Sequence, residues 1–150
     1  TILFGPMYHL FTFKDKLQAL AETKRVTKQG GYIFVGYVMN EYAFIKHAII
    51  GGNLRQALNC GKLNKTYQIL SDEKDLYSYS RLSEIDKLKD ELHLTRQVIF
   101  APDGATDYIR KQINSLSEED FKEYIKYQET VCEFPELLGA SSHVVDVLKK

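Results

Sequence analysis

The chain has 150 residues, of which 44% are hydrophobic and 12% aromatic, enough apolar mass for the core of one domain. Its 20 basic and 20 acidic side chains cancel, which disfavours nucleic acid and anionic membranes as partners. Without a long apolar run, a disulfide framework or a metal-ligand pattern, the sequence indicates a cytoplasmic protein with no membrane segment and no metal site.

The first part of the chain predicts a strand, a helix and a second strand. Residues 2–4 form a short apolar run that Gly5 and Pro6 end. Amphipathic spacing predicts a helix over residues 12–28, and the nearly continuous apolar run of residues 32–39 predicts a central strand covered on both faces. A strand, a helix and a second strand make the crossover unit of parallel sheets, so we expect an α/β fold.

Residues 40–79 lack a strand pattern and predict only two short helices, at residues 42–50 and 54–58. Because this stretch directly follows the carboxyl end of a central strand, where ligands bind in α/β sheets, we interpret it as an insertion that forms a lid. The alternative is a helical layer that packs beside the sheet and has no role in binding.

The second half of the chain predicts helices at residues 83–92, 106–116 and 121–132 and strands at residues 95–101 and 143–148. Ser83 is the expected cap of the first of these helices, and Ser117 of the last. The expected inward face of the last helix consists of Phe121, Tyr124, Ile125, Gln128 and Val131.

Three segments resemble the C-terminal half of bacterial class I S-adenosylmethionine-dependent methyltransferases. They are residues 2–10 (ILFGPMYHL), 21–31 (AETKRVTKQGG) and 139–143 (GASSH). The second is similar to that family's signature of a helix, the sequence LKPGG and a strand, with Gln29 at the usual proline position. The resemblance covers essentially the whole chain, but only the second half of the family's fold.

The resemblance implies a Rossmann-like methyltransferase sheet with helices on both faces. Residues 2–4, 32–39 and 96–101 would be its fourth, fifth and sixth strands, and residues 143–148 an antiparallel seventh strand between the fifth and sixth. The family's glycine-rich cofactor loop has no counterpart here. The chain is therefore expected to be a fragment that lacks the N-terminal cofactor-binding half and is inactive alone.

The resemblance also implies the function, methyl transfer from S-adenosylmethionine to a small-molecule acceptor. Gly5, Pro6 and Met7 would border the cofactor, Tyr8 and His9 would face the acceptor, and Tyr37, Asn40, Glu41, Tyr42 and His143 would line the acceptor side. His9 is the candidate base, because an imidazole can take up a proton near neutral pH.

Each of these roles has a structural alternative. His9 could bond to loop backbone while Tyr8 only packs, residues 40–42 could anchor the insertion, and His143 could be a satisfied residue at a strand end. His47 and His93 are interpreted as helix-surface residues, and Asp103 with Gly104 as a turn.

A non-catalytic α/β binding or scaffolding domain is the alternative function. In either case the strand at residues 2–4 should expose an unpaired edge, which recruits other chains. The expected partner at this edge is the missing N-terminal half or a second copy of the chain, so that residues 1–150 alone should form a dimer, a swapped subunit or an aggregate.

Overall fold

The computed structural model describes residues 1–150 and contains one mixed four-stranded sheet. Its strands are β1 (Ile2–Leu3), β2 (Tyr32–Val38), β3 (Thr95–Phe100) and β4 (His143–Lys149), in the order β1-β2-β4-β3. β1 and β2 are parallel, and β4 is antiparallel to both β2 and β3. The four predicted strands, and the position of the last one between the second and third, are confirmed. β1, β2 and β3 therefore end at the same edge of the sheet, where β4 begins.

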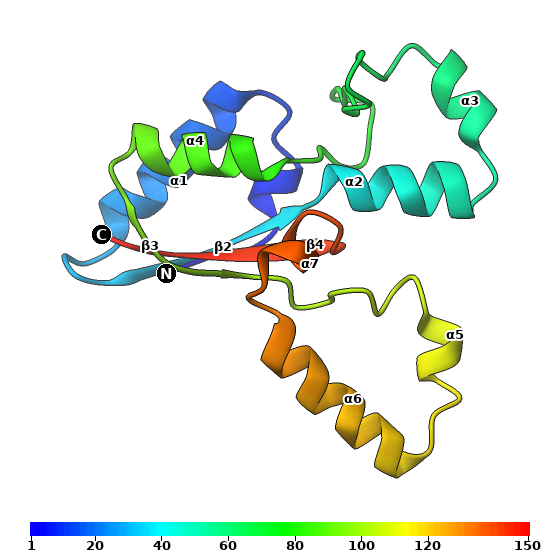
Figure 1. Cartoon of the computed structure of the whole chain (residues 1–150). Helices are drawn as coiled ribbons and strands as arrows, with labels where there is room; N and C mark the ends of the chain where they lie inside the picture. Colours follow the sequence, from blue (N-terminus) through cyan, green and yellow to red (C-terminus); the bar gives the residue numbers. More distant parts are fainter.

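Two helices, α1 (Phe13–Val26) and α4 (Leu82–Glu91), cover one face of this sheet (Figure 1). α1 begins after Thr12, whose hydroxyl accepts a hydrogen bond from the Asp15 backbone N–H at 3.1 Å. α1 ends at Val26, two residues earlier than predicted. The expected cap Ser83 lies inside α4 instead, because that helix starts one residue before it.

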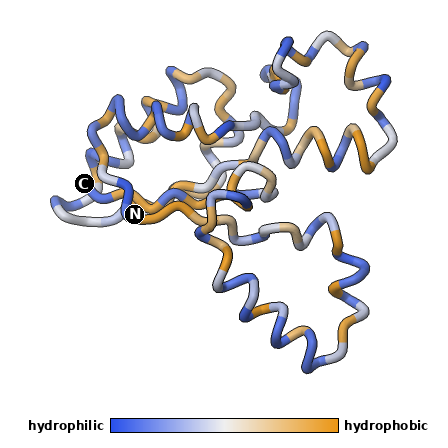
Figure 2. The backbone as a smooth tube through the Cα atoms, viewed as in Figure 1, coloured by the Kyte–Doolittle hydropathy of each residue, from blue (hydrophilic) through white to orange (hydrophobic).

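The core lies between the sheet and these two helices. Ile33, Val35 and Tyr37 of β2 are buried there against residues of α1, α4 and β4. Figure 2 shows the apolar residues concentrated along the strands. Lys16 of α1 is also buried, and its ammonium group donates to Ser80 Oγ at 3.0 Å and Glu84 Oε1 at 3.1 Å.

The opposite face of the sheet keeps apolar side chains in solvent. Tyr32 and Phe34, which alternate with the buried residues of β2, are 46% and 38% exposed, and Ile2 and Phe4 are 69% and 53% exposed. β1 is therefore not the buried strand that its composition suggests, and β2 is fully covered on one face only. This is a correction to the predicted sheet with both faces covered.

Helices α5 (Arg110–Ile113) and α6 (Glu118–Val131) lie on this second side of the sheet in Figure 1, and the short helix α7 (Pro135–Leu138) directly precedes β4. α5 is much shorter than the helix predicted over residues 106–116. α6 has the predicted Ser117 cap but buries none of its residues, and Phe121 and Ile125 of its expected inward face are 43% and 39% exposed. Helices thus lie on both sides of the sheet, but the core is closed mainly by α1 and α4, and Leu138 of α7 is buried in it.

Residues 40–79, called the insertion from here on, leave and rejoin the sheet at one place. Met39 and Ser80 form an isolated parallel bridge, and the Asn40 N–H donates to the Ser80 carbonyl at 3.0 Å. Between them lie α2 (Asn40–Ala43), the π-helix η2 (Phe44–Ile50), α3 (Leu54–Asn59) and an irregular return segment. The predicted helices and the lack of a strand in this stretch are confirmed.

None of the helices in the chain has both the length and the apolar character needed to cross a bilayer.

Candidate functional site

A cavity of about 310 Å³ lies at the edge of the sheet where β1 and β2 end and β4 begins. This volume is within the range of small-molecule sites, roughly 300–1,000 Å³. We call it the site cavity; its lining residues are Tyr8, Val38, Tyr42, His47, Tyr77, Tyr79, Ser142 and His143. The loops after the two parallel strands thus contribute to one hollow, as the topology predicts.

Three of the predicted site residues line this cavity. Tyr8 reaches it from η1 (Pro6–Tyr8), which follows β1, Tyr42 from α2, which follows β2, and His143 from the start of β4. The return segment of the insertion adds Tyr77 and Tyr79. The resulting walls are mainly aromatic, with imidazole and hydroxyl groups among them, which suits a planar ligand that carries polar substituents.

His143 is held by a carboxylate at the end of β3. Asp103 Oδ2 lies 2.7 Å from His143 Nδ1 and also accepts hydrogen bonds from Ser142 Oγ at 2.6 Å and from the His143 backbone N–H at 3.1 Å. These bonds hold the pKa of Asp103 below its usual range, and the bond to Asp103 raises the pKa of His143. With Nδ1–H donating to Asp103, the other ring nitrogen, Nε2, is left to take up a proton.

Tyr42 is held by a second carboxylate from the same part of the chain. Its hydroxyl donates to Asp107 Oδ2 at 2.6 Å, and Lys46 Nζ lies 2.8 Å from the same oxygen. The bond from Lys46, followed by that from Tyr42, lowers the pKa of Asp107 to about 2. Burial and the bond to Asp107 raise the pKa of Tyr42, so this hydroxyl stays protonated and Tyr42 offers its ring to the cavity.

His9, the predicted base, lies outside the site cavity. Its Nδ1 is 3.1 Å from the Leu76 carbonyl, and its ring packs at 4.9 Å from Tyr8 and 5.4 Å from Tyr77, measured between ring centroids. The alternative interpretation, a histidine bonded to loop backbone, therefore matches its placement. His9 supports the wall that Tyr8 and Tyr77 form.

Tyr37 and Met7 belong to the core and not to the site. Met7 is fully buried, although Pro6 beside it is exposed and Gly5 is half-buried. Tyr37 is 1% exposed, its hydroxyl has no hydrogen-bond partner, and burial raises its pKa. Both were expected at the site because they lie near strand ends, but their side chains point to the face that α1 and α4 cover.

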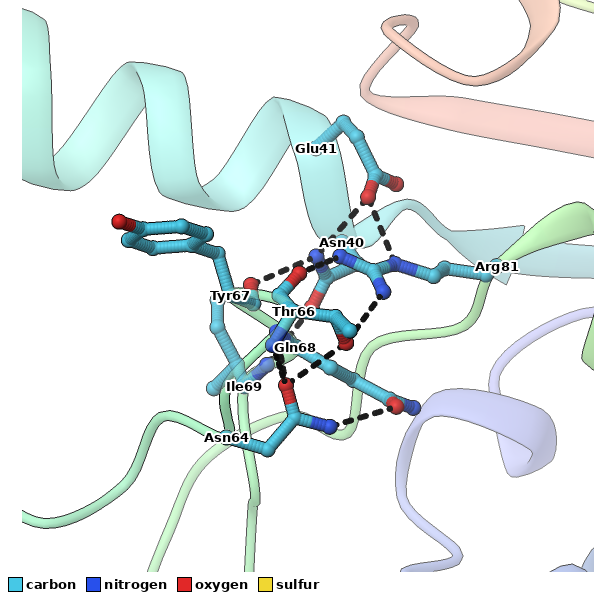
Figure 3. A network of polar contacts seen from close by, with 8 residues as sticks. All are labelled: Asn40, Glu41, Asn64, Thr66, Tyr67, Gln68, Ile69 and Arg81. Atoms are coloured by element: carbon cyan, nitrogen blue, oxygen red, sulfur yellow. Dashed lines mark hydrogen bonds and ion pairs between the residues drawn. The ribbon is translucent and has the colours of Figure 1, made fainter.

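Asn40 and Glu41 hold the insertion in place instead of lining the cavity (Figure 3). Asn40 Oδ1 accepts from the Ile69 N–H at 2.8 Å, and its amide group donates to the Tyr67 carbonyl at 3.2 Å. Glu41 Oε1 accepts from Arg81 Nε at 2.7 Å, and the same guanidinium group donates to Thr66. This network joins the first residues of the insertion, and Arg81 just after its end, to its middle.

Sequence reasoning missed the two aspartates and His47. Asp103 was interpreted as part of a turn. β3 runs parallel to β1 and β2, however, and ligands of α/β sheets bind beyond the carboxyl ends of such strands. The same rule therefore applies to Asp103, which follows the end of β3. His47 was assigned to a helix surface, but it lines the cavity from η2. No group of three or more histidine, cysteine or acidic side chains is arranged to hold a metal ion.

No protein-family model matches the chain, and no curated protein matches it. A functional assignment therefore depends on the geometry of the site.

Proposed function

We propose that this chain is the acceptor-binding part of an S-adenosylmethionine-dependent methyltransferase that acts on a small molecule with a hydroxyl group. The observation that carries the proposal is His143, hydrogen-bonded to Asp103, in the wall of an aromatic cavity at the common edge of three parallel strands. The strand order β1-β2-β4-β3, with β4 antiparallel, supports it because it is the arrangement that the resemblance implies.

The residues present fit one wall of a cofactor site. Gly5 has a positive φ of 100° and Pro6 is exposed, so backbone without bulky side chains faces the open side of β1. Gly5 and Pro6 would border the cofactor there. The chain has no glycine-rich loop for the rest of the cofactor, so we propose that another segment supplies it.

The reaction needs a positioned acceptor and a base. When bound, S-adenosylmethionine supplies a methyl group on a positively charged sulfur. The aromatic rings of Tyr8, Tyr42 and Tyr79 would hold the acceptor. His143 Nε2 would accept the proton of the acceptor hydroxyl as its oxygen takes the methyl group and the bond between that methyl group and sulfur breaks. Asp103 orients the imidazole and stabilises the imidazolium ion that results.

Binding of the cofactor is the first test. Calorimetry should be carried out with S-adenosylmethionine on the natural polypeptide that contains these residues, and separately on residues 1–150. We expect binding heat from the natural polypeptide. If it shows none, the proposed activity is wrong.

Two histidine variants then identify the base. Because a positioned base contributes about 10²–10⁴-fold to a rate, His143→Gln should lower kcat for methylation of catechol or another phenol by that factor, with cofactor affinity unchanged. His9→Gln, outside the cavity, should change kcat by much less. If His9→Gln lowered kcat more than His143→Gln, His9 would be the base.

A non-catalytic α/β binding domain is the second candidate. The apolar side chains exposed on β1 and β2 favour it, because an open sheet face is a surface for another chain. A natural polypeptide that binds no cofactor but forms a stable complex through this face would support this candidate.

A further inference from the structure

A second cavity, of about 370 Å³, lies within the insertion. Its walls come from α2, η2, α3 and the return segment, which face one another across it. The apolar part of its lining consists mainly of Ala43, Phe44, Ala48, Ala57, Leu63 and Ile69. We call it the insertion cavity.

The insertion cavity adjoins the site cavity. His47, Tyr77 and Tyr79 line both, so three side chains form the partition between them. A single ligand that passes these side chains can occupy both spaces, with one end beside His143.

The polar groups of the insertion cavity favour an uncharged occupant. Lys62 Nζ lies 2.6 Å from Asp75 Oδ2 and 3.3 Å from Asp72 Oδ2, so the one ammonium group in the wall is already neutralised. Ser71 Oγ is enclosed and has no hydrogen-bond partner. An apolar chain gains most from such a space, because each methylene group it buries leaves water.

We propose that the insertion cavity binds an apolar arm of the methyl acceptor, whose aromatic hydroxyl head lies in the site cavity. The acceptor class is then a phenol or catechol with an alkyl or similar hydrocarbon substituent. The assignment of the head group rests on the proposed function, whereas the binding of the arm is independent of catalysis.

A series of phenols tests the arm. Phenol, 4-propylphenol and 4-hexylphenol differ only in chain length. Calorimetry gives the Kd of each, and protection of Cys60, which lines the insertion cavity, against a thiol reagent reports whether the arm occupies that cavity. Cys132→Ser leaves Cys60 as the only thiol, because the chain has two cysteines. We expect Kd to fall by up to about fourfold for each added methylene until the cavity is full.

A matched pair of variants locates the effect. Ala57→Phe places a ring in the insertion cavity and should remove the gain from the longer chains while leaving the affinity for phenol unchanged. Leu58→Phe adds a ring at the neighbouring position of α3, which does not line the cavity, and should keep the gain. If Ala57→Phe does not fold, a second comparison decides whether the arm lies in the insertion cavity. Protection of Cys60, measured in Cys132→Ser, is compared with protection of Cys132, measured in Cys60→Ser.

The outcomes separate this proposal from the proposed function. If 4-hexylphenol binds no more tightly than phenol, or protects both thiols equally, the arm site is wrong even where phenols are methylated. If chain length raises affinity and Ala57→Phe abolishes the gain, the arm site stands, even if no bound phenol is methylated when cofactor is present.

Discussion

The protonation state of His143 depends on one carboxylate oxygen. Asp103 Oδ2 accepts hydrogen bonds from Ser142 Oγ and from the backbone N–H of His143 and lies 2.7 Å from its Nδ1, so Asp103→Asn would remove the charge at this position and keep the size of the side chain. We expect the pKa of His143 to fall towards the ordinary value of about 6.5 or below it. NMR titration of the four histidines measures this, with Glu119→Gln on the exposed surface of α6 as the control. An unchanged titration of His143 would contradict the assigned hydrogen bond.

The same substitution should change how stability depends on pH. The raised pKa of His143 contributes stability that is fully present below about pH 6.5 and is lost as pH rises through the folded value. The lowered pKa of Asp103 contributes above about pH 4 and is lost as pH falls through the folded value. Urea midpoints of the protein and of Asp103→Asn should therefore differ most between these limits. The difference should be small, because the side chains of His143 and Asp103 are 50% and 37% exposed.

For single residues, the sequence predicted which ones lie near the end of a strand better than it predicted which way their side chains point. The sequence shows that Tyr8, Tyr42 and His143 lie near strand ends, and all three line the site cavity. Met7 and Asn40 also lie near strand ends but do not line this cavity, because tertiary packing decides which way a side chain points. No local signal in the sequence distinguishes these cases.

Among the structural elements, the insertion depends on Asn40 more than on any one apolar contact. Asn40 is 1% exposed and bonds to backbone groups of Tyr67 and Ile69, which Asn40→Ala would leave without partners (Figure 3). We expect the insertion to open more easily by about 1–3 kcal/mol, while the sheet keeps its stability. Hydrogen exchange of residues 62–79 measures the opening.

The control for this prediction is Asn59→Ala, at the exposed end of α3. It removes an amide of the same size without a comparable network and should leave exchange in residues 62–79 unchanged. If both variants exchange alike, the network around Asn40 does not hold the insertion closed.

The strands and the positions of α4 and α6 were predicted well, whereas the burial of α6 and the helix over residues 106–116 were not. The short apolar runs of β2 and β4, rich in valine, have the length and composition of strands buried in a sheet, so the pattern and the structure agree. The amphipathic pattern of α6 shows where a partner surface would bind but not whether one is present, and Phe121 and Ile125 remain in solvent. The predicted helix over residues 106–116 is mostly loop, in which Asp107 binds Tyr42 and Lys46.

For the whole molecule, the open sheet face predicts self-association. Ile2 and Phe34 are paired in register across β1 and β2, so they project from the same face, beside the unpaired edge of β1. We expect residues 1–150 to associate at micromolar concentration, and the double variant Ile2→Lys/Phe34→Lys to sediment as a monomer, because charge on an exposed face and edge blocks pairing.

Sedimentation velocity tests this expectation. Val26→Lys is the control, since Val26 is 60% exposed on α1, away from the open face, and its replacement should leave association unchanged. If the unaltered chain sediments as a monodisperse monomer, the open face does not mediate self-association.

The bridge between Met39 and Ser80 has a consequence for how such a protein can diversify. Because the two ends of the insertion are hydrogen-bonded neighbours, the forty intervening positions form a cassette that can be lengthened, shortened or exchanged without shifting the register of β2 against β4. Grafting a cassette of different sequence between these two anchors would alter which molecules are admitted while the Asp103–His143 pair stays where it is.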